Sequence, residues 1–188
     1  MSGSLPERLL DTGILQFGYF VIDNKVAPVR FCPEYLPAYP DLLTHLGKLT
    51  APEFAASEVD HLIATADSVP LGLVCSLQTG LSMVYSRGRG ESAVYDLVGS
   101  YNTGHMSALL MNSVEDEVAT QKFISNARSV GLETRIIVTL VEMRHIDQLA
   151  DIPVRSVFRL IDIIQTLITV GRLSEGQAQA VLKWINAR

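Results

Sequence analysis

The chain reads HLIATADSVPLGLVCSLQTGLSMVY at residues 61–85, where two short apolar runs flank an apolar segment of helical length. His61–Thr65 and Leu81–Tyr85 have the length and composition of buried strands. Pro70–Thr79 between them is predicted to be a helix that ends at Gly80. A strand, a helix and a second strand in this order predict a parallel pair of strands, with the helix crossing one face of the sheet.

The same alternation continues beyond residue 85. Ala93–Val98, Met106–Met111 and Arg135–Val141 read as further strands, the first two joined by a turn-like segment over 99–104. Glu115–Val130 between them is predicted to be a helix that Gly131 ends. Its buried face is predicted from the apolar residues that recur at helical spacing, which are Ala119, Phe123, Ala127 and Val130.

The two ends of the chain have different patterns. Near the N-terminus, Leu5–Thr12 is predicted to be a helix, Phe17–Phe31 a β-rich segment interrupted by a turn at Asp23-Asn24, and Asp41–Leu49 a second helix. Near the C-terminus, Val154–Val170 is predicted to be an apolar helix with one stripe, Val157, Ile161, Ile164 and Ile168. A last helix is expected to begin at Ser174, because Gln177 follows at capping-box spacing.

Composition excludes several classes of protein. Of 188 residues, 48% are apolar and 19% charged, which argues against disorder. The net charge is −5 and no long basic run occurs, so no nucleic-acid or anionic-membrane partner is expected. The apolar stretch from Val154 is broken by charged residues, and the N-terminus lacks the pattern of a signal peptide. Cys32 and Cys75 are expected to be reduced, packed thiols in a cytoplasmic protein.

A group of short motifs carries a resemblance to a known family. The most specific is GILQFGYF at residues 13–20, and Ala27-Pro28, VPLG at 69–72, GLSMVY at 80–85 and Gly131-Leu132 are in register with it. From Leu9 to the C-terminus the chain resembles orotate phosphoribosyltransferase, a type I phosphoribosyltransferase. That family joins orotate to phosphoribosyl pyrophosphate with Mg²⁺, which gives orotidine monophosphate in pyrimidine biosynthesis.

The resemblance implies an α/β fold, in which helices flank a central, mostly parallel sheet. It implies one domain over residues 1–188, with an N-terminal β-rich hood and helix over 1–50, a core over 55–145 and a C-terminal helical pair over 153–188. The family is commonly a homodimer. The high mean hydropathy of this chain, +0.25, also favours a homodimer.

The family's phosphate-binding loop is altered in this sequence. In the family, a strand ends in two acidic residues, and a loop of threonine, glycine and serine then opens a helix whose N-terminus holds a phosphate. Here Met111 and Asn112 replace the acidic pair, and Glu115, Asp116 and Glu117 stand in the loop. Three carboxylates repel a phosphate. The residues from Ser113 to Asp116 also suit an ordinary helix start, and a new cation site is the alternative.

Other positions that match the family's cleft differ as well. The pyrophosphate loop resembles GxATGGIP in the family and reads IATADSVP at 63–70, where an acid replaces a glycine. The catalytic loop keeps two arginines in Ser86–Ser92 but has no lysine, and Met143 takes the place of an arginine. The candidate substrate-binding residues are Lys25, Ser68, Arg87, Arg89, Asn112, Ser113, Glu115, Asp116, Glu117 and Arg144.

No other catalytic or metal motif is evident. The four histidines, His45, His61, His105 and His145, have no ligand spacing. Cys75 lies in an apolar helix, where an inert thiol is expected rather than a nucleophile. We therefore assign no catalytic residue, no metal ligand and no cofactor from the sequence. Arg87 and Arg89 lie in a Gly-bracketed loop that suits either solvent or an anion.

Three functions are compatible with this pattern. The first is a phosphoribosyltransferase-like protein that has lost phosphoribosyl pyrophosphate binding and catalysis and acts as a binding or regulatory subunit. The second is an active orotate phosphoribosyltransferase with a rearranged site that uses Mg²⁺. The third is a packing module that associates with an active pyrimidine-pathway enzyme. The retained apolar framework beside several altered positions favours the first.

Overall fold

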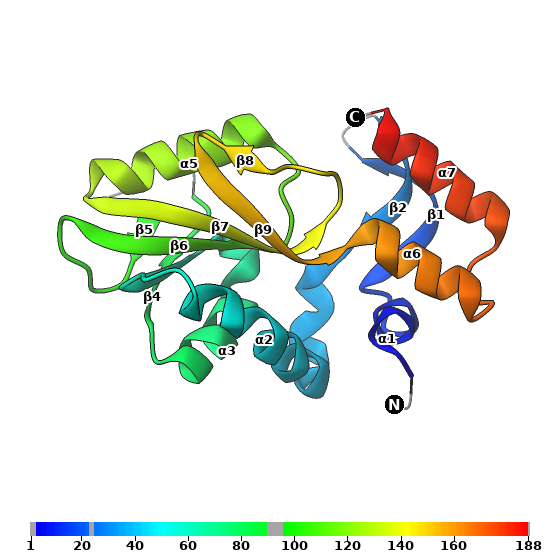
Figure 1. The fold of residues 1–188 in the computed structure, drawn as a ribbon, viewed down its shortest axis with the longest axis horizontal. Coiled ribbons are helices and arrows are strands. Elements are labelled where there is room, and N and C mark those ends of the chain that lie inside the picture. The colour runs from blue at the N-terminus through cyan, green and yellow to red at the C-terminus, as the bar shows by residue number, and fades with distance from the viewer. Residues whose placement is uncertain (1–2, 23–24, 90–95, 188) are drawn as a thin grey trace.

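The computed structural model describes residues 3–22, 25–89 and 96–187, and its centre is a twisted, mostly parallel sheet (Figure 1). Among these residues the sheet has seven strands in the order β5-β4-β3-β6-β7-β9-β8. The parallel strands are β3 (His61–Ala64), β4 (Ser82–Ser86), β6 (His105–Met111), β7 (Leu132–Glu142) and β9 (Ile152–Arg159). The short strands β5 (Leu97–Val98) and β8 (Gln148–Leu149) pair antiparallel at the two edges.

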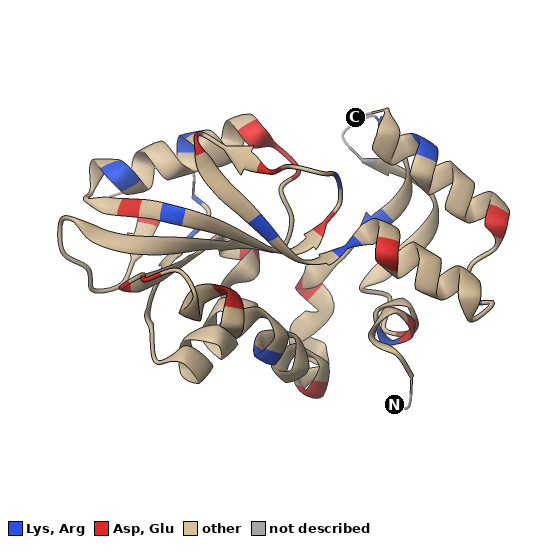
Figure 2. Cartoon of the chain, viewed as in Figure 1, with Lys and Arg blue, Asp and Glu red and all other residues tan. Residues whose placement is uncertain are grey.

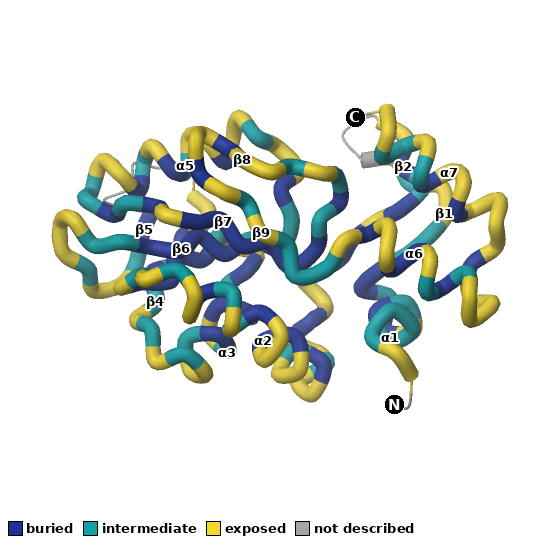
Figure 3. Tube along the Cα trace, in the orientation of Figure 1, coloured by how far each residue is buried: buried dark blue, intermediate teal, exposed yellow. Residues whose placement is uncertain are grey.

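Helices cover both faces of this sheet. The helices α2 (Pro40–Ala55) and α3 (Val69–Thr79) lie on one face and α5 (Glu117–Ser129) on the other (Figure 1). Because strand side chains alternate, Leu62 and Leu110 belong to the core with α2 and α3, whereas Ile63 and Leu109 belong to the core with α5. Figure 3 shows β6 and β7 largely buried, while β9 and the outer surfaces of the helices are mostly intermediate or exposed. The predicted fold class is confirmed.

The N-terminal hood is built by both ends of the chain. Its strands β1 (Leu15–Ile22) and β2 (Lys25–Phe31) pair antiparallel, and the short helix α1 (Leu5–Asp11) precedes them. The C-terminal helices α6 (Leu160–Thr169) and α7 (Glu175–Asn186) lie beside the hood in Figure 1. Val29 of β2 is in one cluster with Ala178 and Val181 of α7. The predicted turn at Asp23-Asn24 lies outside the described residues.

The predicted helix over Val154–Val170 is wrong in its first third. The chain forms β9, which pairs with β7 from Val154 to Arg159, and only then turns into α6. No glycine or proline separates strand from helix after Pro153, so one apolar pattern runs through both. Of the predicted stripe, Ile164 is buried and Val157 and Ile168 are partly buried against the core, but Ile161 is exposed. Helix α6 also buries Leu160, Ile163 and Leu167.

Two further boundaries differ from the sequence prediction. The N-cap of α5 is Asp116 rather than Ser113. Of its predicted buried face, Ala127 is buried, Phe123 and Val130 are partly buried against the core and Ala119 is exposed, and the helix also buries Thr120 and Ile124. Within the predicted strand Ala93–Val98 the described residues begin at Asp96, and Leu97–Val98 forms a strand that pairs with β4 at the sheet edge rather than beside β6. Residues 90–95, which include part of the predicted 86–92 loop, lie outside the described residues.

The remaining predicted elements are present. Helix α2 extends six residues beyond the predicted Leu49, to Ala55. Two 3₁₀ segments, Pro33–Ala38 and Ala66–Ser68, lead into α2 and α3. The capping box that begins α7 forms between Ser174 and Gln177 as predicted. Among residues 3–22, 25–89 and 96–187, no helix is long and apolar enough to cross a membrane, and Figure 2 shows acidic and basic residues interspersed over the surface.

Candidate functional site

Nine of the ten candidate residues lie at the end of the sheet where the parallel strands have their carboxyl ends, called here the carboxyl edge. The parallel strands β3, β4, β6 and β7 all end at this edge, and the loops that follow them carry the candidates. In open α/β sheets the carboxyl ends of the strands are where ligands bind. The loops at this edge carry Ser68; Arg87 and Arg89; Asn112, Ser113, Glu115, Asp116 and Glu117; and Arg144.

The loops after β3 and β6 are joined to each other by hydrogen bonds. Asn112 donates through Nδ2 to the Asp67 carbonyl oxygen at 2.8 Å and to Asp67 Oδ2 at 2.9 Å. The Ser68 hydroxyl donates to the Leu110 carbonyl at 2.9 Å. Asn112 is 2% exposed and Ser68 fully buried. Asn112 therefore joins the two loops, and Ser68 joins the loop after β3 to the strand β6, at the positions where the family resemblance expects ribose and pyrophosphate to bind.

The first turn of α5 is occupied by carboxylates of the chain itself. Asp116 Oδ1 accepts a hydrogen bond from Ala119 N at 3.0 Å, so the helix is capped by its own anion. Glu117 Oε1 lies 2.5 Å from Arg144 Nη2, in an ion pair that joins this helix to the loop after β7. Ser113 Oγ faces Glu115 Oε1 at 3.4 Å. These contacts are those of an ordinary helix start and not of a vacant anion site.

A carboxylate that the sequence analysis missed, Asp96, is hydrogen-bonded to residues 86, 87 and 89, which follow or end β4. Asp96 is 8% exposed and accepts hydrogen bonds from the Ser86 hydroxyl and, at 3.0 Å, from the Arg89 backbone N–H. Arg87 N donates to the Asp96 carbonyl at 3.0 Å. The sequence feature that could have revealed Asp96 is its position as an acid inside the apolar run 93–98. The backbone N–H groups of residues 87 and 89 are thus hydrogen-bonded to Asp96, while the Arg87 and Arg89 residues are exposed.

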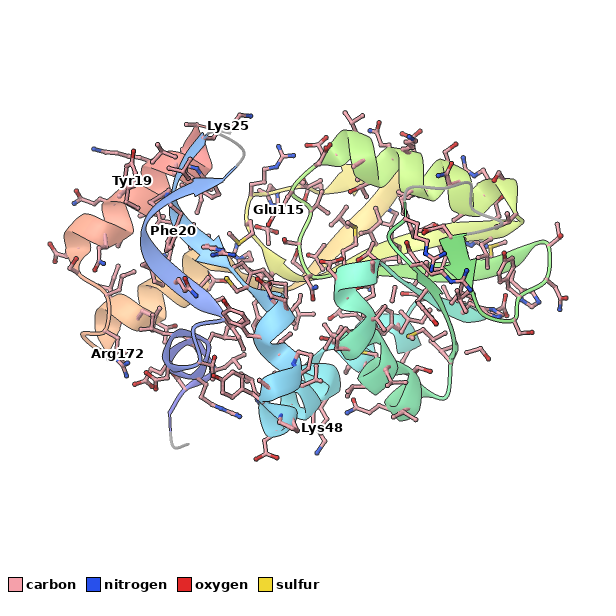
Figure 4. The ribbon with its side chains drawn as sticks, turned by 180° about the vertical axis from the view of Figure 1, so that it is seen from behind. Tyr19, Phe20, Lys25, Lys48, Glu115 and Arg172 are labelled. Carbon is pink, nitrogen blue, oxygen red and sulfur yellow. The ribbon has the colours of Figure 1, made fainter. Side chains whose placement is uncertain are left out.

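Lys25 is the one candidate that comes from the hood. It is exposed at the start of β2, and among the described residues it makes no ion pair with the loops of the sheet edge. Figure 4 shows Lys25 at the end of the hood hairpin and Glu115 in the loop before α5. The two labelled residues belong to different parts of the molecule, so a ligand between them would contact hood and core together.

The two thiols are buried, and two of the four histidines stack on each other. Burial raises the pKa of the Cys75 thiol to about 12, and burial also raises that of Cys32. His61 and His105 stack with ring centroids 4.7 Å apart, at the opposite, amino edge of the sheet. Within the part of the chain that the structure describes, no group of three His, Cys, Asp or Glu side chains could hold a metal ion.

Solved structures identify the class of fold. The chain has the type I phosphoribosyltransferase fold, while no family model and no curated protein matches its sequence. It is similar to Leishmania donovani UMP synthase, with a TM-score of 0.85 and 19% identity, over 98% of this chain and 42% of that one. The chain therefore spans less than half the length of that protein.

Within this class the similarity extends to orotate phosphoribosyltransferases. The enzyme from Francisella tularensis matches with a TM-score of 0.70 and 17% identity, over 95% of each chain. Adenine phosphoribosyltransferase from Thermoanaerobacter pseudethanolicus matches with a TM-score of 0.59 and 11% identity, over 82% of this chain and 99% of that one. The fold is thus that of orotate phosphoribosyltransferase-like proteins, and identities this low establish the fold alone.

Proposed function

We propose that this chain is a pseudoenzyme, a phosphoribosyltransferase-like protein that does not bind phosphoribosyl pyrophosphate and acts as a binding or regulatory subunit. The observation that carries the proposal is the first turn of α5. In the family that the chain resembles, this turn receives the substrate's 5′-phosphate. Here Asp116 caps the helix and Glu117 pairs with Arg144. A phosphate would have to displace one carboxylate and lie beside the others.

The neighbouring loops support the same proposal. Position 112 is an asparagine, so it offers no carboxylate to ribose hydroxyls. Its Nδ2 atom donates hydrogen bonds to Asp67. The Arg89 backbone N–H donates to Asp96. The Asn112 amide and the Arg89 N–H thus bind groups of the chain itself, while Asn112 Oδ1 has no hydrogen-bond partner among the described residues.

The direct test is titration calorimetry with phosphoribosyl pyrophosphate and Mg²⁺. We expect no binding tighter than about 1 mM, a standard free energy of about −4 kcal/mol. An assay of orotate consumption at 295 nm is expected to show no turnover. Micromolar binding alone would overturn the proposal. Micromolar binding with turnover would support instead the second candidate, an active orotate phosphoribosyltransferase that uses Mg²⁺ and whose loops rearrange around substrate.

The chain is also proposed to pair with a second copy of itself. Leu73 and Leu77 lie one turn apart on α3 and are 52% and 77% exposed, an apolar ridge on an outer helix. We expect sedimentation at micromolar concentration to give about twice the chain mass of 20.6 kDa, and Leu77→Glu to halve it. Val118→Glu changes an equally exposed residue on α5 and is the control. A wild-type monomer would refute the pairing.

A regulatory role requires a partner enzyme. We propose that the chain associates with an active enzyme of pyrimidine biosynthesis, because a fold without substrate binding contributes by contact rather than by chemistry. Co-purification from the source cells tests this, and a chain that never associates with such an enzyme lacks the role.

A further inference from the structure

A pocket of about 670 Å³ lies near the amino ends of β3 and β4, at the opposite end of these strands from the candidate site. Its wall is made by the C-terminal half of α2, the last turn of α3 and the segments that enter β3 and β4. The apolar part of this wall consists of Ala51, Pro52, Phe54, Ala55, Val59 and Leu81. Pockets of 300–1,000 Å³ with apolar walls and a few polar groups are typical of small-molecule sites.

Two opposite charges stand at the pocket. Lys48 and Glu58 both line it, both are exposed, and neither forms an ion pair among the described residues. In Figure 4, Lys48 projects from α2 at the edge of the molecule away from Glu115. Glu58 has φ of +47°, in the left-handed region that non-glycine residues rarely adopt. Strained residues of this kind cluster at binding sites.

The C-terminal ends of two helices make the pocket more negative near Glu58 than near Lys48. Ala55 and Thr79 are the last residues of α2 and α3, and both line the pocket, so the negative ends of two helix dipoles meet there. Glu58 follows the end of α2 and adds a carboxylate to that region. Lys48 lies seven residues before Ala55, which is about 10 Å along the helix axis. The pocket thus has a negative and a positive end with an apolar wall between them.

We propose that this pocket binds an apolar zwitterion of dipeptide size. The ligand's ammonium group lies at Glu58 and the two helix ends, and its carboxylate lies at Lys48. Its apolar body covers Pro52, Val59 and the alanines of α2. Size favours a ligand larger than a single amino acid, and charge separation along α2 matches a molecule whose two charges are at opposite ends. The site shares no residue with the candidate site at the carboxyl edge, so this proposal does not depend on whether the chain binds phosphoribosyl pyrophosphate.

The test uses the full chain and three matched probes in ¹⁵N NMR titrations. The probes are leucyl-tryptophan, its N-acetyl form without the ammonium group and its C-terminal amide without the carboxylate. We expect the zwitterion to shift the amides of residues 48–59 and 77–82 and to bind about threefold to fivefold more tightly than either analogue, the range of an exposed ion pair. Absence of these shifts, or equal affinity for all three probes, would overturn the proposal.

Two variants assign each charge to its partner. Glu58→Gln keeps the side-chain length and is expected to abolish the preference for leucyl-tryptophan over its N-acetyl form. Lys48→Gln is expected to abolish the preference over the amide, while Glu175→Gln on α7 changes neither. If sedimentation shows a dimer and Leu77→Glu uncovers the pocket amides, the pocket is an interface between copies, and the ligand proposal is overturned.

Discussion

Gly131→Ala is expected to lower the free energy of unfolding by about 3 kcal/mol, the sum of left-handed strain and overpacking. Gly131 has φ of +91°, and an added Cβ would lie 2.6 Å from Thr103 Cα, an atom of the backbone that no rotamer change can move. Its carbonyl accepts a hydrogen bond from Gly104 N at 2.7 Å, where the chain enters β6 beside β7. The substitution therefore presses on the register of two central strands.

Gly80→Ala is the matched control. Gly80 also ends a helix with positive φ, +74°, but an added Cβ would meet nothing within 4 Å. Only the conformational term remains, about 1–2 kcal/mol. Urea denaturation of both variants measures the difference, and equal losses would show that the approach of Thr103 is not a constraint in solution.

These glycines also show how far the sequence predicts the fold. Gly80 and Gly131 were predicted as helix ends, and both have the left-handed conformation that this role requires. The strands and helices between residues 61 and 142 follow from their apolar spacing, because each element there is bounded by a glycine, a proline or a turn. Where that punctuation is missing, at the junction of β9 and α6, the pattern gave a helix where a strand lies.

The candidate site was predictable in part. Sequence spacing places the candidates after strand ends, and parallel strands bring those ends to one edge. The contacts that close the site join distant residues: Asn112 to Asp67, 45 positions apart, and Arg144 to Glu117, 27 apart. No local pattern encodes such pairs. Arg144 directly follows Met143, the position where the family has an arginine, and its ion pair with Glu117 shows which group it meets.

Removing the carboxylates from the start of α5 is expected to create an anion site. In the triple variant Glu115→Thr, Asp116→Gly, Glu117→Gly, the helix loses its cap and Arg144 loses its partner. The helix should lose about 1–2 kcal/mol of stability. The uncapped amides and the Arg144 guanidinium then face solvent together, and sulfate affinity is expected to rise at least about tenfold, or 1.4 kcal/mol.

The measurement is a sulfate titration followed by NMR shifts of the backbone amides of residues 117–120. Glu175→Gln, at the capped N-terminus of α7, removes a charge without removing a cap and is expected to gain no sulfate affinity. Turnover of orotate should stay absent, because Met111 and Asn112 still offer no carboxylate to ribose hydroxyls. The reason for the expected gain is specific: the anion replaces Asp116 at Ala119 N and Glu117 at Arg144. A folded triple variant without sulfate affinity would show that this helix start is not the equivalent of the family's phosphate loop, and the proposal that internal carboxylates exclude the substrate would fail with it.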